Sequence, residues 1–212
     1  LVEARNHLGA FCLAPPVLPR RWRSERLRGW GGLCETMRRP LVNIFVYHRI
    51  LPERSEDGVT VKMFNRQLGY LRKNYSILNG SQLIAFLQGE FTLYGPGAAI
   101  AFDDGWLDNW LIATPILAEK GVPAILAPTT GFIHDGPLRS DPTLSIGRMR
   151  CDDAFTRAIY EGDSEAFLSW NEVNAMRESR LWSIQAHGHT PVAGYYSLKN
   201  HPGFYPERNH WS

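Results

Sequence analysis

From residue 41 onwards, short apolar runs alternate with amphipathic segments. The run LVNIFVYH (41–48) is almost entirely apolar and rich in β-branched residues, as is typical of a strand buried in a parallel sheet. The following segment VKMFNRQLGYLRKN (61–74) repeats its apolar residues at helical spacing. The alternation continues with a strand at 75–78, a helix at 81–89, a strand at 97–102, a helix at 109–121 and a strand at 123–128. This order predicts an α/β fold with a parallel sheet or barrel.

Residues typical of helix ends mark several of these boundaries. Ser81 is a candidate N-cap, and Gly89 and Gly121 follow predicted helices as C-terminal caps. Ser169 and Glu172 have the spacing of a capping box and predict a helix over 169–179, followed by a strand at 182–187. Residues 131–169 are irregular and rich in Gly, Asp and Pro, so we expect a long loop or insertion there.

Charge divides the chain into two parts. Residues 1–40 contain eight arginines and three glutamates, a net charge of +5, together with several prolines and glycines. We expect these residues to form a basic, poorly ordered arm, and residues 41–212 to form the folded domain. The folded part contains 15 basic and 18 acidic residues, a net charge of −3. A nucleic-acid partner is therefore not expected.

Neither membrane insertion nor disulfide bonding is indicated. No run reaches the roughly 18 apolar residues of a membrane-spanning helix, so we expect no integral membrane segment. The short apolar run LGAFCLAPPVL (8–18) lies before the basic cluster, whereas in a secretory signal the basic residues come first. The sequence therefore does not indicate whether the protein is cytoplasmic or in the cell envelope. Cys12, Cys34 and Cys151 are widely spaced, and no C-x-x-C motif is present.

Polar residues lie at the ends of three predicted strands. His48 ends the first strand, Asp103-Asp104-Gly105 follows the third, and His187 ends the last. In parallel α/β folds the carboxyl ends of the strands meet at one edge, where functional groups gather. D-G is also a common turn pair, and Asp104 could simply cap the helix that follows. One aspartate together with the histidine pair His187 and His189, which lie two residues apart, would, however, form a three-ligand set for a catalytic metal.

Four segments resemble, in the same order, the motifs of the polysaccharide deacetylases (NodB homology domain, carbohydrate esterase family four). AIAFDDGWLDN is similar to the family's T-F-D-D-G signature, and FVYHRI to its Y-H-R-[IV] opening. PILAEKGVPAILAPTTGFI resembles its P-I-L-x-x-x-G-[IV]-P-A-T-x-F segment, and LSWNEVNAMRESRLWSIQAHGHT resembles the segment leading into its H-[ST]-x-x-H metal motif. The match spans roughly residues 41–192.

The resemblance implies a fold, an activity and a set of site residues. The fold would be a distorted (β/α) barrel, and the activity a metal-dependent removal of N-acetyl groups from a sugar polymer or glycoconjugate. Asp103 would be the general base, and Asp104 and His187 would bind the divalent metal, zinc being the expected ion. His48 would line the site.

The sequence departs from the family at the second metal histidine. That position is Pro191, so His189 is the nearest substitute ligand, and it shares a face with His187 only if the strand geometry continues. His201 and His210 are weaker candidates. The family's later motifs, including the L-x-H segment with its general acid, are not visible, so the barrel is expected to be incomplete. Two alternatives follow: a non-catalytic, carbohydrate-binding NodB-like module, and a hydrolase that removes another acyl group such as formyl.

Overall fold

The computed structural model describes residues 41–141 and 149–189 in full, and residues 194–196 and 202–204 by their backbone. The predicted basic arm, Pro191, His201 and His210 lie outside the described residues.

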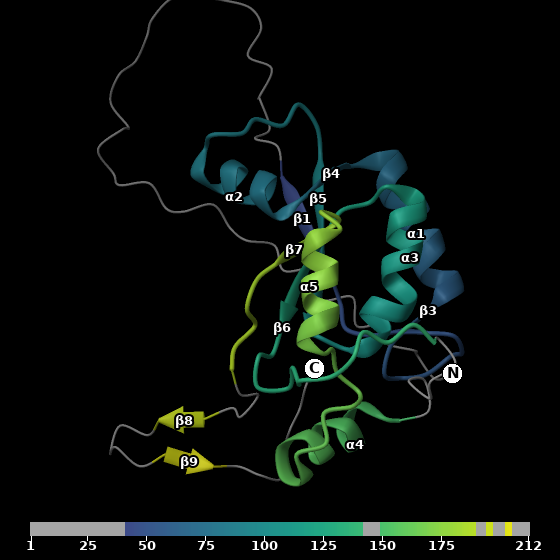
Figure 1. Ribbon diagram of the computed structural model, residues 1–212. Helices are drawn as coiled ribbons and strands as arrows, with labels where there is room; N and C mark the ends of the chain where they lie inside the picture. The colour runs from purple at the N-terminus through teal and green to yellow at the C-terminus, as the bar shows by residue number, and fades with distance from the viewer. Residues whose placement is uncertain (1–40, 142–148, 190–193, 197–201, 205–212) are drawn as a thin grey trace, which may run out of the picture.

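The fold is built on a parallel five-stranded sheet (Figure 1). Its strands follow the order β1 (Val42–Tyr47), β5 (Gly97–Asp104), β6 (Ala124–Pro128) and β7 (Trp182–Ile184), with β4 (Ser76–Leu78) beside the first half of β5. All of these pairings are parallel. Tyr47 lies opposite Phe102, and Phe102 lies opposite Leu126, so the carboxyl ends of β1, β5 and β6 meet at one edge.

Helices connect the strands and cover both faces of the sheet. They are α1 (Val61–Asn74), α2 (Gly80–Gln88), the π-helical turn η2 (Asn109–Ala113) continuing into α3 (Thr114–Lys120), α4 (Cys151–Thr156) continuing into the π-helical turn η3 (Arg157–Glu161), and α5 (Trp170–Glu178). Two small strand pairs complete the described structure: β2 (Ile50–Leu51) with β3 (Val59–Thr60), and β8 (Gly194–Tyr196) with β9 (Pro202–Phe204). The predicted α/β class is confirmed, and within the described residues the sheet stays open at β1 and β7.

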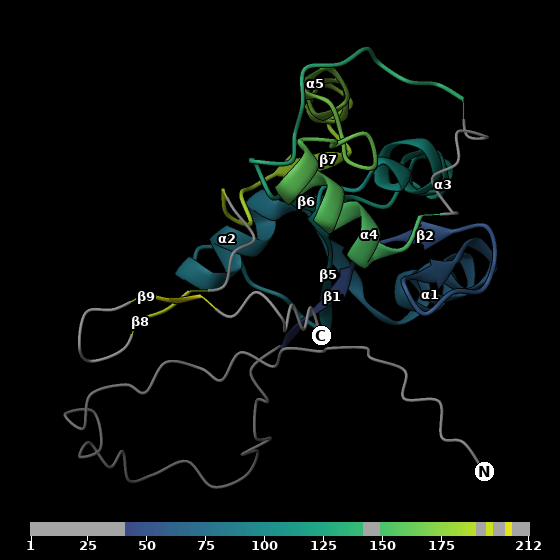
Figure 2. The ribbon, with the colours of Figure 1, turned by 90° about the horizontal axis from the view of Figure 1, so that it is seen from below.

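Alternation along β5 separates the core into two layers. Ile100 and Phe102 face the larger cluster, which includes side chains from α1, α3 and α5. Ala99 and Ala101 face the opposite way and pack against Leu83 of α2. Figures 1 and 2 show α2 on the other side of the sheet from α1 and α3. The same alternation directs Asp103 to the alanine side of the strand.

Most predicted elements are confirmed. Strand β5 runs two residues further than predicted and includes Asp103 and Asp104, and three other corrections follow. Helix α2 is capped by Asn79, whose side chain pairs with Gln82 in a capping box, and not by Ser81. The irregular segment 131–169 contains helix α4, which the sequence analysis did not predict. Strand β7 ends at Ile184, three residues before His187.

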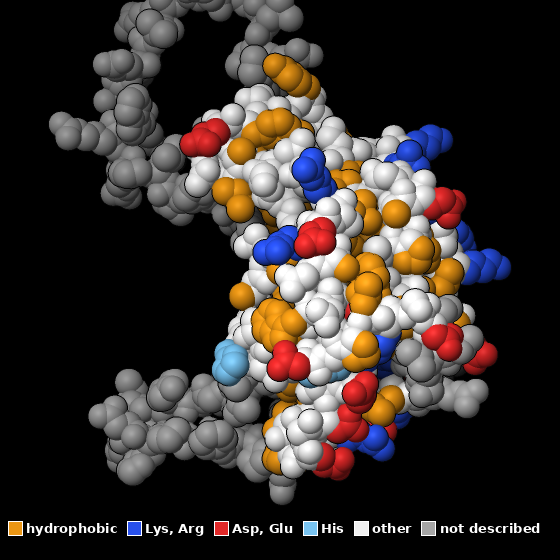
Figure 3. All heavy atoms as spheres, in the orientation of Figure 1, with side chains coloured by type: hydrophobic (Ala, Val, Ile, Leu, Met, Phe, Trp, Pro, Cys, Tyr) orange, Lys and Arg blue, Asp and Glu red, His pale blue; other side chains and the backbone are white. Residues whose placement is uncertain are grey.

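The described surface mixes charges of both signs. Figure 3 shows basic and acidic side chains interspersed over one face. Among the described helices, none combines the length and the apolar character required to cross a bilayer.

Candidate active site at the carboxyl ends of the strands

Four of the five predicted site residues come together at the carboxyl edge of the sheet. His48 follows β1, Asp103 and Asp104 end β5, and His187 follows β7. The Oδ1 atom of Asp104 lies 4.0 Å from Nε2 of His187. Asp103 is close enough to His187, His48 and Asp104 for all three to affect its pKa. The convergence expected from parallel strands is therefore present.

The D-D-G segment forms a tight turn that presents the two carboxylates differently. Gly105 N donates to Asp103 O at 2.8 Å, which closes a three-residue turn around Asp104, whose φ is +66°. A positive φ at the centre of such a turn is rare and strained for a residue with a side chain. Gly105 has a φ of +84°, and a Cβ at this position would lie 2.8 Å from Cβ of Pro128. The chain thus requires glycine here.

The alternative interpretation of this segment, a turn in which Asp104 caps the next helix, is confirmed for the turn and wrong for the cap. A turn does form, but the carboxylate of Asp104 does not cap the helix. No side-chain cap is present at η2, and Oδ2 of Asp104 instead accepts a hydrogen bond from Nε1 of Trp106 at 3.2 Å. Asp104 is buried at this point, with 3% of its surface exposed. Its second oxygen faces His187.

Asp103 is half-buried and has a raised pKa. Burial is the main cause, because removal from water disfavours the charged carboxylate. His187 and His48 oppose this rise, and the negative charge of Asp104 adds to it. A carboxylate with a raised pKa is a better proton acceptor when it is ionised, which suits the role of general base.

Hydrogen bonds fix the backbone at His187, whereas its side chain is exposed. Its N–H donates to Pro128 O at 3.1 Å, and Gln185 N donates to Leu126 O at 2.8 Å, so the chain follows β6 beyond the end of β7. The imidazole is 44% exposed, whereas the Asp104 side chain beside it is 5% exposed. The pair therefore combines a fixed, buried carboxylate with a ring that solvent reaches.

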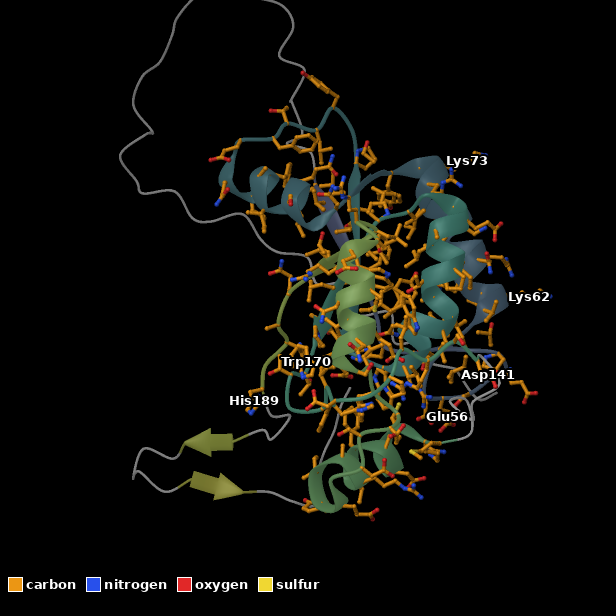
Figure 4. All side chains as sticks on the ribbon, in the orientation of Figure 1. Glu56, Lys62, Lys73, Asp141, Trp170 and His189 are labelled. Carbon is orange, nitrogen blue, oxygen red and sulfur yellow. The ribbon has the colours of Figure 1, made fainter. Side chains whose placement is uncertain are left out.

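His189 does not join this pair in the described structure. Gly188 has a φ of +155°, so the regular alternation of a strand is not kept between the two histidines. Nδ1 of His189 lies 3.0 Å from Thr130 Oγ1, and Figure 4 shows the side chain at the outer edge of the segment. Among the described residues, no three His, Cys, Asp or Glu side chains form a metal-binding cluster. His189 as a third ligand stays a prediction.

A buried network that the sequence did not predict lies beneath the site. Arg49 and Asp108 form an ion pair at 3.0 Å, and Asn109 Nδ2 donates to the backbone oxygen of His48 at 2.8 Å. These residues, with Trp106, lie inside the FVYHRI and AIAFDDGWLDN segments. The available signal was a charged residue next to apolar positions in each segment, Arg49 before Ile50 and Asp108 after Leu107, because a buried charge requires a partner.

Comparison with known proteins supports the fold. No protein-family model and no curated protein sequence matches the chain. Similar solved structures include a de-N-acetylase from Aggregatibacter actinomycetemcomitans, with a TM-score of 0.54 and 18% identity over 76% of this chain and 60% of that one. IcaB from Ammonifex degensii gives a TM-score of 0.52 and 24% identity over 69% and 52%. The deacetylase PplD from Streptococcus pyogenes, solved in complex with acetate, gives 0.50 and 20% over 72% and 57%.

These similarities define the class of fold. The chain has the α/β fold of these deacetylases, as the motif resemblance implied. It spans 52–60% of the length of the three solved chains.

Proposed function

We propose that the chain forms part of a metal-dependent hydrolase that removes N-acetyl groups from a sugar polymer or glycoconjugate. The observation that supports this most directly is the 4.0 Å approach of Asp104 Oδ1 to His187 Nε2, with Asp103 beside them. An oxygen and a nitrogen donor next to a half-buried carboxylate suit metal-assisted hydrolysis of an amide.

The donor pair fits zinc. Zinc binds histidine nitrogen and carboxylate oxygen at about 2.0–2.2 Å, so two ligands of a tetrahedral ion lie roughly 3.4 Å apart. The observed 4.0 Å needs only a small side-chain shift, and the exposed imidazole of His187 is free to make it. When bound, zinc would lower the pKa of a water molecule and polarise the acetamide carbonyl.

The protein residues would divide the remaining work. Asp103 would accept the proton of the attacking water, a task that its raised pKa favours. His48 and His187 are both exposed, which leaves the site open to a large substrate such as a glycan. Hydrolysis would release acetate and leave a free amine on the sugar.

The third ligand determines which of two functions applies. His189 is the proposed candidate, because its hydrogen bond to Thr130 involves Nδ1 and leaves Nε2 available for a metal. The alternative is a non-catalytic carbohydrate-binding module, which is favoured by the two-residue donor set in the described part of the chain.

Acetate release tests the proposed function. The purified protein, stripped with a chelator and then reloaded with zinc, is incubated with N-acetylglucosamine oligomers, and free acetate is measured. We expect zinc-dependent acetate release that is lost in Asp103→Asn and kept in Asp135→Asn, a control at an exposed aspartate. Oligomer binding without acetate release under any metal would establish the binding module instead.

A further inference from the structure

We infer that Trp106 is a positioning residue for Asp104, and that its indole N–H fixes which carboxylate oxygen faces His187. This inference rests on the proposed function, in which Asp104 is a metal ligand. It adds a residue that does not touch substrate or metal but acts through Asp104.

The two oxygens of Asp104 have different partners. Oδ2 accepts the hydrogen bond from Trp106 Nε1 at 3.2 Å, and Oδ1 lies 4.0 Å from His187 Nε2. An indole N–H is a donor only, and Trp106 is fully buried, so it requires an acceptor. The carboxylate of Asp104 supplies that acceptor, and the bond in turn prevents the carboxylate from rotating freely.

The indole is itself held by aromatic packing. Its ring centroid lies 4.6 Å from that of Phe167 and 5.1 Å from that of Phe155. These rings and Phe132 form a separate apolar cluster beside the site. The cluster fixes the plane of the indole and hence the direction of its N–H.

A buried cation completes the support. The guanidinium carbon of Arg49 lies 4.6 Å from the Trp106 ring centroid, within the range of a cation–π contact. Arg49 cannot shift easily, because it donates to Asp108 Oδ2 at 3.0 Å and to Met149 O at 2.7 Å. Asp104 is thus connected through Trp106 and Arg49 to Asp108, all four being buried.

Removal of the indole N–H tests this role. Trp106→Phe keeps an aromatic ring and removes the donor. Trp182→Phe is the matched control, because Trp182 is also buried and its Nε1 donates to the neutral Thr114 Oγ1 at 3.1 Å. Zinc affinity is measured by competition with a chromophoric chelator, and stability by urea unfolding of the metal-free protein.

The two substitutions should differ in metal binding and not in stability. We expect Trp106→Phe to weaken zinc binding by about 10- to 100-fold, the usual effect of losing an outer partner of a ligand, and Trp182→Phe to leave it within about threefold. Equal zinc affinities in the two variants would overturn the inference. If Asp104→Ala weakens zinc binding while Trp106→Phe does not, the inference fails and the proposed metal site stands.

A metal-free measurement separates the inference from the proposed function. The ¹⁵N–¹H resonance of the Trp106 indole is followed by NMR in the unsubstituted protein, in Asp104→Ala and in Asp103→Ala. We expect a large change in Asp104→Ala and a small one in Asp103→Ala, even if Trp106→Phe does not fold. A resonance unchanged in Asp104→Ala would overturn the inference. A resonance that responds to Asp104 in a protein that binds no zinc would leave the positioning intact and refute the proposed metal site.

Discussion

Arg49 and Asp108, 59 residues apart in the sequence, form an almost fully buried ion pair beneath the candidate site. Arg49 Nε lies 3.0 Å from Asp108 Oδ2, and the other carboxylate oxygen accepts a hydrogen bond from Ile50 N at 2.9 Å. The pair joins the segment after β1, which includes His48, to the helix that follows Asp103 and Asp104. Together with Asn109 Nδ2, which donates to His48 O at 2.8 Å, this pair connects the two segments of the site.

Substitution of Arg49 should destabilise the protein strongly. Arg49→Met keeps much of the side-chain volume but leaves the buried Asp108 carboxylate without its cation, and this typically costs about 3–5 kcal/mol. The control is Arg157→Met, because the side chains of the Arg157–Asp163 pair, at 3.3 Å, are 48% and 34% exposed, and solvent-exposed pairs contribute about 0–1 kcal/mol. Urea unfolding of both variants measures the difference. Equal losses in the free energy of unfolding would show that the buried pair contributes no more to stability than the more exposed pair.

The parts of the fold that follow local periodicity could be predicted from the sequence. Helix α1 has the predicted bounds, and the Ser169–Glu172 capping box forms as its spacing indicates. The N-cap of α2 is Asn79 and not the predicted Ser81, although Asn79 and Gln82 have the same capping-box spacing as Ser169 and Glu172. Helix α4 was missed, since its six residues are too few for a clear period in a segment rich in turn-forming residues.

The site depends on contacts between residues far apart in the sequence, and only some of these could be predicted. His48, Asp103, Asp104 and His187 could be expected to meet, because parallel strands bring their carboxyl ends to one edge. The orientation of His189 could not, since it depends on the backbone angles at Gly188 and on contact with Thr130, which is 59 positions away. The hydrogen bond from Trp106 to Asp104 could not be predicted either, because it forms within a turn in which Asp104 has a positive φ.

A second buried ion pair should stabilise the loop that precedes α4. Arg139 donates from Nε and NH2 to the two oxygens of Glu172, at 2.8 and 2.7 Å, and Glu172 also accepts from Ser169 N. Glu172→Gln keeps the shape but places an amide N–H₂ among donors, so we expect a loss of about 3–5 kcal/mol in the free energy of unfolding. Glu165→Gln is the control, since Glu165 pairs with the same arginine at 3.4 Å while 77% exposed. A comparable loss of unfolding free energy in both variants would contradict the stabilising role of the buried Arg139–Glu172 pair.

The thiol of Cys151 should be nearly inert at neutral pH. Burial raises its pKa to about 12, and Sγ donates weakly to Asp57 O at 3.8 Å. An ordinary thiol has a pKa near 8.5, so the thiolate fraction of Cys151 at pH 8 is smaller by roughly a thousandfold. Its alkylation by iodoacetamide, followed at the Cys151 peptide by mass spectrometry, should be slower by about that factor than in the urea-unfolded chain. Modification at the unfolded rate would show that the thiol is accessible and unperturbed.

The two adjacent aspartates should separate metal binding from proton transfer. Asp104→Asn removes the charge that attracts a cation, so zinc affinity should fall by more than the roughly 10- to 100-fold cost of losing an outer partner. Asp103→Asn should keep zinc and lower the rate of acetate release by about 10²- to 10⁴-fold, the usual contribution of a general base. Zinc titration and the acetate assay on both variants give the comparison. Equal loss of zinc in the two would show that both carboxylates are ligands.

The two histidines should differ in how much they contribute to zinc binding. His187 already faces Asp104, so His187→Ala should reduce zinc affinity as strongly as Asp104→Asn. His189 must first turn towards the pair, with Thr130 still bonded to its Nδ1, so His189→Ala should cause a smaller loss. Thr130→Val removes that outer bond, and if His189 binds through Nε2 it should weaken zinc binding by about 10-fold or more. Zinc titration of all three variants decides the matter: affinity unchanged in both His189→Ala and Thr130→Val would exclude His189 as a ligand, while leaving the Asp104–His187 pair as the core of the site.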